Sequence, residues 1–120
     1  MSDNNFDARA IAANPSVREL PARIALEMLQ RGDDVVYLDV RELHEWNLFR
    51  IPGAVHIPLG TLREQAPGRI AAGRRVMVYC ARGGRAATAA QTLADLGYSD
   101  VVSLEGGLSA WVSVGGVLEE

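Results

Sequence analysis

The residues with the clearest chemical potential are a single cysteine and the glycines and arginines that follow it. Cys80 is the one cysteine of the 120 residues, and Gly83 and Gly84 lie between it and Arg85. Glycines let the backbone curl so that successive N–H groups point inward, and such a nest binds anions. The N-terminus of a following helix adds to this field and stabilises a thiolate. Arg82 and Arg85 add positive charge, so the pattern predicts a nucleophilic cysteine that meets an anionic substrate.

The plainer interpretation is that Cys80 is a small buried hydrophobe and that the glycines only form a turn. We favour the reactive interpretation, because a spectator cysteine has no physical need for neighbouring glycines and arginines. Other polar residues are assigned structural roles: Asp39 and Arg41 as a salt bridge, and Glu45 as a structural partner. We expect His56 to hold a turn rather than to act as a base. The two histidines and one cysteine are too scattered for a zinc site, and no metal or cofactor is expected.

Short apolar runs rich in β-branched residues predict buried strands, and helical patterns separate them. The clearest helical face begins at Ala86 and stops at Gly97, a typical helix-ending residue. Strands that alternate with helices indicate an α/β domain with a mostly parallel sheet. Cys80 then lies at the carboxyl end of a strand, where such sheets bind ligands. The predicted strands are 35–38, 54–57, 76–79 and 101–104, and the further helical segments are 41–48 and 108–112.

The segment before the first of these strands gives conflicting signals. The apolar residues from Val17 onward follow a helical spacing, and Ser16 with Glu19 forms a capping-box pattern. Pro21 would remove a hydrogen bond inside that helix. Either residues 16–20 form a separate turn or the helix proper begins at Pro21, and we favour the second.

The chain length fits one domain. We expect residues 1–14 to form a loose leader and residues 15–120 to form the domain. Residues 59–73 are expected to be mostly loop, with a helix broken around Pro67 and Gly68.

Composition and charge exclude several classes of function. A net charge of −3 argues against a nucleic-acid binder, which normally has a basic face. All 12 basic residues are arginines, which excludes lysine Schiff-base chemistry and the lysine-bearing phosphate loop. A lone cysteine makes no internal disulfide, and the start of the sequence matches neither a signal nor a transit peptide. The longest apolar runs are far shorter than the roughly 20 residues of a membrane span. We therefore expect a cytoplasmic protein that binds neither nucleic acid nor membrane.

Several separate segments, in their order and spacing, resemble a rhodanese domain. The resemblance runs from about residue 16 to residue 117, nearly the whole chain. It implies a rhodanese-like three-layer α/β/α fold with a five-stranded, mostly parallel sheet. Phe49 and Arg50 depart from the glycine and histidine that the family usually has there. The matching segments are 38–42, 45–46, 51–54, 56–59, 78–85, 104–107 and 110–111.

The resemblance implies a sulfurtransferase that moves a sulfane sulfur from a donor such as thiosulfate to a thiophilic acceptor, through a persulfide on Cys80. Backbone amides of the loop would stabilise the anionic persulfide, and Arg82 would attract anionic donors. For Arg85, a catalytic and a structural role are both open. The implied partners are a small sulfur-donor anion and a thiol or cyanide acceptor, which includes thioredoxin-like and sulfur-carrier proteins. The residues implied to bind substrate are Ala81, Arg82, Gly83, Gly84 and Arg85.

Two other functions are weighed against this one. Related phosphatases and arsenate reductases have one residue more between their cysteine and arginine than the four that separate Cys80 from Arg85 here. The shorter loop forms a smaller anion-binding site, which suits a sulfur atom better than a tetrahedral oxyanion. The other alternative is a catalytically idle interaction module, which has no need of a reactive loop. The sequence leaves the physiological donor, the acceptor and the oligomeric state open.

Overall fold

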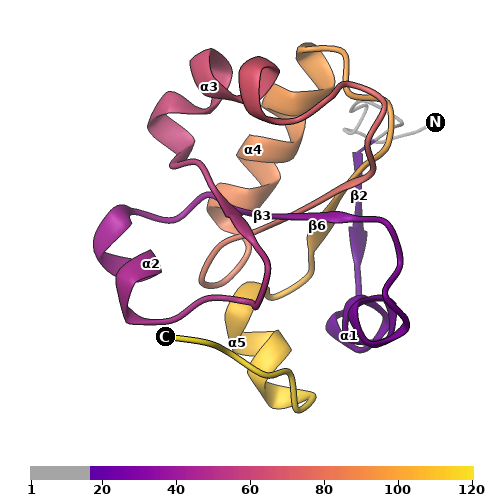
Figure 1. Cartoon of the computed structure of the whole chain (residues 1–120), viewed down its shortest axis with the longest axis vertical. Helices are drawn as coiled ribbons and strands as arrows, with labels where there is room; N and C mark the ends of the chain where they lie inside the picture. The colour runs from indigo at the N-terminus through magenta and orange to yellow at the C-terminus, as the bar shows by residue number, and fades with distance from the viewer. Residues whose placement is uncertain (1–16) are drawn as a thin grey trace, which may run out of the picture.

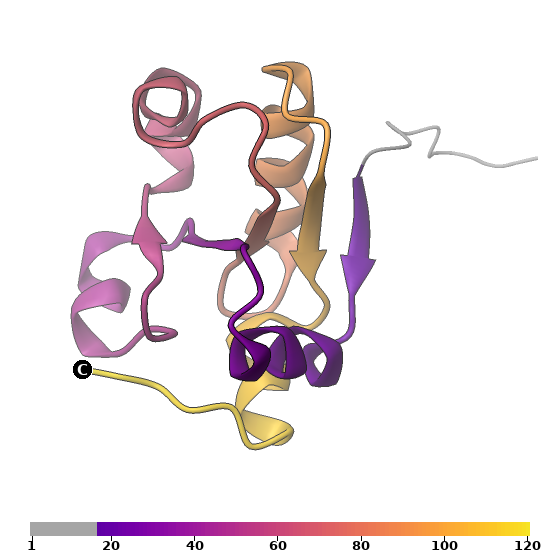
Figure 2. The same cartoon turned by 45° about the vertical axis from the view of Figure 1, so that its right-hand side comes forward.

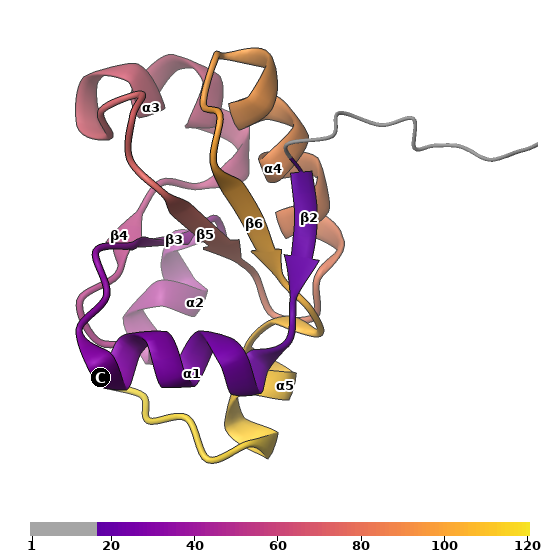
Figure 3. The ribbon, with the colours of Figure 1, turned by 90° about the vertical axis from the view of Figure 1, so that its right-hand side faces the viewer.

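Five parallel strands form one sheet, in the order β2-β6-β5-β3-β4, in the computed structural model, which describes residues 17–120 (Figure 3). This confirms the expected α/β fold and five-stranded sheet. The strands are β2 (Val17–Leu20), β3 (Val36–Asp39), β4 (Val55–His56), β5 (Val76–Tyr79) and β6 (Val101–Leu104). The helices are α1 (Ala22–Arg31), α2 (Leu43–Leu48), α3 (Leu62–Arg69), α4 (Gly84–Asp95) and α5 (Gly107–Ser113), with a 3-10 turn, η1 (Leu59–Thr61).

Helices cover both faces of the sheet, α3 and α4 on one side and α1 and α5 on the other (Figure 1). In β5, Val76 and Val78 face the first pair of helices, and Met77 and Tyr79 face the second pair. This alternation follows from the two-residue period of a strand. Since each face is covered, every residue of β5 is buried, which explains why the strand is apolar without alternating with polar residues.

The chain reverses direction through a helix after most strands, so the carboxyl ends of the strands meet at one edge of the sheet. Asp39 ends β3, and Tyr79 ends β5 immediately before Cys80. Figure 2 shows the loop after β5 and the start of α5 together beyond this edge. The fold therefore places Cys80 where parallel sheets bind their ligands.

The segment before α1 is a strand, which neither the helical spacing from Val17 onward nor the alternative of a turn over residues 16–20 predicted. Residues 17–20 pair in parallel with residues 101–104 as β2 and β6. The hydrogen bonds of this pairing come from residues far along the chain, so local spacing does not report them. The expected helix start is confirmed, because Pro21 is the N-cap of α1. The cap at Ser16 and the leader 1–14 lie outside the described residues.

Pro67 does not break the helix that contains it, which corrects the expected interruption around Pro67 and Gly68. Both residues lie within α3, and a side chain from outside the helix binds one carbonyl near its C-terminus and that of the C-cap residue. The Tyr98 hydroxyl lies 3.0 Å from the Ala66 carbonyl oxygen and 2.6 Å from that of Ile70. This side chain secures the end of a helix that a proline would otherwise weaken.

None of the helices within residues 17–120 is long and apolar enough to cross a membrane.

Candidate functional site

The Cys80 side chain lies inside the loop that follows β5, and two backbone amides point at its sulfur. The Gly83 N–H donates to Sγ at 3.0 Å, and the Ala86 N–H donates at 3.4 Å. Gly83 has φ 119°, a backbone conformation that favours glycine. It is the N-cap of α4, so the sulfur sits at the positive end of a 12-residue helix. Amides and helix end together favour negative charge on sulfur at this position.

The N-terminus of helix α5 holds the backbone of the loop that follows β5. The N–H groups of Leu108 and Ser109 donate to the carbonyl oxygens of Cys80 and Ala81, at 2.9 and 3.1 Å. This approach requires Gly107, because a Cβ atom there would lie 2.5 Å from the Cys80 carbonyl oxygen. Gly106 and Gly107 therefore let α5 hold the backbone that carries Cys80.

Arg85 is fixed by a carboxylate from α2. Its two terminal nitrogens donate to the two oxygens of Glu45, at 2.7 and 3.0 Å. Glu45 also accepts the Glu42 backbone N–H at 2.9 Å, as part of a capping box at the start of α2. The hydrogen bonds from Arg85 lower the pKa of Glu45 to about 2 and raise that of Arg85. The contact ties the loop to α2, which gives Arg85 a structural role in this arrangement.

The Glu45–Arg85 pair makes stability depend on pH, and Glu45→Gln tests this. Because the pKa of Glu45 is lower in the folded state than in the unfolded state, the pair stabilises the fold at any pH above the unfolded-state pKa. This stabilisation is lost as the pH falls toward the folded-state pKa. Between the ordinary value of 4.5 and the folded value of about 2, we expect the stability gap between wild type and Glu45→Gln to shrink. Near neutral pH the gap should be about 1–2 kcal/mol, allowing for solvent screening of a partly exposed pair.

The measurement is urea unfolding of both proteins from neutral pH to the lowest pH at which they fold. Glutamine keeps an oxygen for the Glu42 N–H, so the helix cap is preserved. The control is Glu27→Gln, which breaks an exposed pair with Arg23 at 3.5 Å and should cost about 0.5 kcal/mol or less. A gap for Glu45→Gln that stays constant with pH would contradict the account.

A buried ion pair lies beside this contact, as expected for Asp39 and Arg41. The side chains are 0% and 3% exposed, and Arg41 Nε and Nη2 donate to the Asp39 carboxylate at 2.8–3.1 Å. Arg41 Nη2 also donates to the Phe49 carbonyl oxygen. The pair therefore joins the end of β3 to the end of α2, and so positions the helix that carries Glu45.

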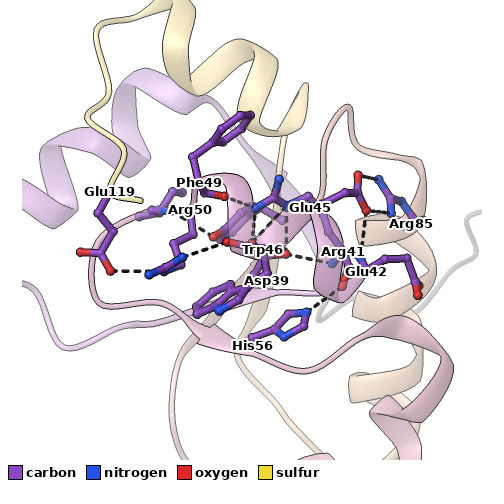
Figure 4. Close-up of polar contacts among 12 residues, drawn as sticks. Asp39, Arg41, Glu42, Glu45, Trp46, Phe49, Arg50, His56, Arg85 and Glu119 are labelled. Atoms are coloured by element: carbon purple, nitrogen blue, oxygen red, sulfur yellow. Dashed lines mark hydrogen bonds and ion pairs between the residues drawn. The ribbon is translucent and has the colours of Figure 1, made fainter.

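Figure 4 shows the rings of Trp46 and His56 below this pair, where they stack on each other. His56 Nε2 is 2.8 Å from the Arg41 carbonyl oxygen, and the ring stacks on Trp46 with centroids 4.9 Å apart. This places His56 in a turn-holding contact and not on the Cys80 sulfur. Arg50 lies over the Trp46 ring and pairs with Glu119, whose backbone bridges that of Arg50. The end of the chain is thereby brought against α2.

A pocket of about 400 Å³ opens beside the loop that follows β5. Ala81 and Arg82, the two residues after Cys80, line this pocket, but Cys80 itself does not. Arg82 lines it and is exposed, whereas the Cys80 residue is only 1% exposed. Its lining combines polar side chains with apolar ones, and most of the apolar ones come from α2, α5 and the end of the chain. The lining residues are Arg41, Glu45, Leu48, Phe49, Ala81, Arg82, Leu108, Ser109, Val112 and Leu118.

The structure brings together part of the substrate-binding set inferred from sequence. Ala81 and Arg82 line the pocket, and Gly83 donates to Sγ, whereas the side chain of Arg85 is held by Glu45. Gly84 begins α4, which therefore starts earlier than the face predicted from Ala86. The second amide on Sγ belongs to Ala86, which the sequence analysis did not include; a helix start placed nearer Gly84 would have pointed to it. Among residues 17–120, no three His, Cys, Asp or Glu side chains gather as a metal site.

Comparisons with known proteins agree on one family. Residues 22–114 match the family described as Rhodanese-like domain. The solution structure of the rhodanese-like domain of an Anabaena protein has a TM-score of 0.80 at 30% identity, over 84% of this chain and 77% of that one. Thiosulfate sulfurtransferase from Pseudomonas aeruginosa has a TM-score of 0.75 at 35% identity, over 85% of this chain and 19% of that one.

Among curated proteins, the adenylyltransferase and sulfurtransferase MOCS3-1 of Zea mays is 33% identical over 111 residues, which are 82% of this chain and 24% of that protein. The chain spans about half the length, or less, of the curated relatives it matches first. The similarity therefore concerns one domain of those proteins. With the family match over 93 of the 120 residues, from 22 to 114 inclusive, and the shared fold, the chain belongs to the rhodanese-like domain family.

Proposed function

We propose that this chain is a sulfurtransferase that moves a sulfane sulfur from a small anionic donor such as thiosulfate to a thiophilic acceptor, through a persulfide on Cys80. The observation that carries the proposal is the pair of amides, from Gly83 and Ala86, on the Cys80 sulfur at the N-terminus of α4. Preorganised donors of this kind stabilise charge that develops on the atom they face. The names of related sulfurtransferases support the same chemistry.

The reaction has two steps, each a displacement at sulfur. The Cys80 thiolate attacks the outer sulfur of thiosulfate; an S–S bond forms to Sγ, the S–S bond of thiosulfate breaks, and sulfite leaves with the electron pair. The acceptor then attacks the outer sulfur of the persulfide, and the electron pair of that bond returns to Sγ. With cyanide as acceptor the product is thiocyanate. A thiol, including one on a thioredoxin-like or sulfur-carrier protein, gives the corresponding persulfide.

The loop residues have distinct roles in this scheme. The Gly83 and Ala86 amides stabilise the thiolate that starts and ends the cycle. Arg82, exposed at the pocket, attracts the anionic donor. Arg85 is a positioning residue, because Glu45 occupies both of its terminal nitrogens. The same occupancy argues against a phosphatase, which would need a free guanidinium for the phosphate oxygens. A cytoplasmic location completes the proposal.

The test is steady-state transfer from thiosulfate to cyanide, followed as thiocyanate, with an aryl phosphate as the rival substrate. Wild type should form thiocyanate well above the uncatalysed rate, and Cys80→Ser should not. Hydrolysis of the aryl phosphate should stay at background in both proteins. Equal thiocyanate rates for wild type and Cys80→Ser would overturn the proposal, and no transfer with any donor would favour the idle interaction module.

A further inference from the structure

The pocket beside the loop is larger than an inorganic sulfur donor requires. Thiosulfate occupies on the order of 100 Å³, judged against the roughly 30 Å³ of a water molecule in the liquid. The pocket holds about 400 Å³, within the range of sites that bind small organic molecules. A cyanide or thiosulfate ion would leave most of this space unused.

One wall of the pocket is apolar and open to solvent. Leu48 from α2 and Val112 from α5 are 62% and 53% exposed, and Phe49 is 39% exposed. Leu108 and Leu118 complete this wall, the latter carried there by the bridge between the Arg50 and Glu119 backbones. Exposed apolar side chains gathered around one hollow are typical of a ligand site. The wall therefore fits the hydrocarbon part of a ligand.

The pocket also holds a buried guanidinium, which lies beside the Phe49 ring of the apolar wall. Arg41 lines the pocket with a side chain only 3% exposed, and its Nε and Nη2 are bound by Asp39 and by the Phe49 carbonyl oxygen. Within residues 17–120, its Nη1 has no hydrogen-bond partner. Buried N–H donors are nearly always satisfied, so this nitrogen is available to an acceptor on a ligand in the pocket. Arg82 adds a second, exposed guanidinium to the same pocket.

We propose that the pocket selects an organic thiol with an acid group and an apolar chain as the sulfur acceptor. The acid oxygens bind Arg82 and Nη1 of Arg41, and the chain lies against Leu48 and Val112. This rests on the proposed function, since it names the acceptor class of the same site. The acceptor thiolate attacks the outer sulfur of the Cys80 persulfide; a new S–S bond forms, the old one breaks, and its electron pair stays on Sγ. No oxidant or reductant is consumed.

The test is single-turnover discharge of protein that has been loaded with sulfur from thiosulfate or inorganic polysulfide. The acceptors are cyanide, mercaptoacetate, mercaptohexanoate and mercaptohexanol. Mercaptohexanoate should half-saturate at a concentration about tenfold below both mercaptoacetate, which lacks the chain, and mercaptohexanol, which lacks the acid. Arg82→Ala should reduce the advantage of mercaptohexanoate over mercaptohexanol and leave its advantage over mercaptoacetate.

A matched pair of double variants tests the apolar wall. Leu48→Ser with Val112→Ser should abolish the tenfold advantage of mercaptohexanoate over mercaptoacetate. Leu43→Ser with Val114→Ser should keep it: Leu43 and Val114 are 59% and 41% exposed, lie on or at the ends of the same two helices, and do not line the pocket. The ratio between acceptors is compared within each protein, so a general loss of activity does not imitate the effect.

The outcomes separate the two proposals. Equal half-saturating concentrations for all three thiols, with normal discharge to cyanide, would overturn the acceptor class and leave the sulfurtransferase intact. An advantage that survives in the Leu48 and Val112 double variant would also overturn it. Failure to load sulfur from either source would remove both proposals.

Discussion

Replacing Asp39 with alanine is expected to lower the free energy of unfolding by about 3–5 kcal/mol, because it leaves a buried guanidinium without its counter-charge. Asp39 and Arg41 have side chains that are 0% and 3% exposed. The substitution removes the acceptor of the Arg41 backbone N–H at 2.9 Å and of the guanidinium at 2.8–3.1 Å. Within residues 17–120, the Phe49 carbonyl oxygen would be the one acceptor left for the Arg41 guanidinium. Urea unfolding at neutral pH measures the loss.

The control is Asp34→Ala, which breaks a surface pair of equal length. Asp34 and Arg74 are 2.8 Å apart, but their side chains are 86% and 43% exposed. Its loss should cost about 0.5 kcal/mol or less. Similar costs for Asp39→Ala and Asp34→Ala would show that the buried pair does not hold α2 against the end of β3 as described.

Gly107→Ala is expected to cost about 2–5 kcal/mol and to slow the loading of sulfur on Cys80 by about a hundredfold. Its Cβ would lie 2.5 Å from the Cys80 carbonyl oxygen and 2.7 Å from the carbonyl carbon and oxygen of Ala81. Neither backbone can yield without moving the loop, and a displacement of about 1 Å at a nucleophile is enough for a loss of this order. Gly107 also has φ 60°, which adds strain for any other residue.

Gly115→Ala is the control that measures the cost of backbone strain without a steric clash. Gly115 follows the same helix with φ 88°, and nothing lies within 4 Å of its Cβ position. It should cost about 1–2 kcal/mol from backbone strain alone and leave the loading rate unchanged. Loading by Gly107→Ala at the wild-type rate would contradict the claim that α5 positions the nucleophile. Both measurements need only urea unfolding and the time course of sulfur loading.

The sequence predicts the centre of the fold well because the central strands are fully buried. The apolar runs 76–79 and 101–104 coincide with β5 and β6. A strand that is covered on both faces carries its own signal in four consecutive residues. The cysteine loop is predicted for a similar reason, since Cys80 and the glycines that follow it are neighbours in sequence.

The edge strand β2 was not predicted from the sequence, because the contacts that stabilise it are not local. The apolar residues of segment 17–20 are spaced as in a helix. The segment is a strand because it pairs with residues 101–104. The error at Pro67 is of the same kind. Tyr98, about thirty residues away, satisfies the end of α3. Neither contact leaves a trace in the nearby sequence.

The support of the site is also built from distant residues. Glu45 and Arg85 are 40 residues apart, and nothing in either segment selects the other as a partner. Gly107 lies against the carbonyl groups of Cys80 and Ala81, a contact that the sequence around Gly107 does not reveal. The contribution of Leu118 to the pocket depends on the bridge between Arg50 and Glu119. Local patterns thus indicated Cys80 as the proposed nucleophile, whereas the contacts that position it required the fold.

The central claim is that Cys80 carries sulfur, and the intact mass of the protein after incubation with thiosulfate tests it most directly. Wild type should gain the mass of one sulfur atom and lose it when cyanide is added, whereas Cys80→Ser should gain nothing. Inorganic polysulfide serves as a second donor, so a preference among donors is not mistaken for inactivity. A gain of sulfur by Cys80→Ser equal to that of wild type, or no gain by wild type with either donor, would contradict the account.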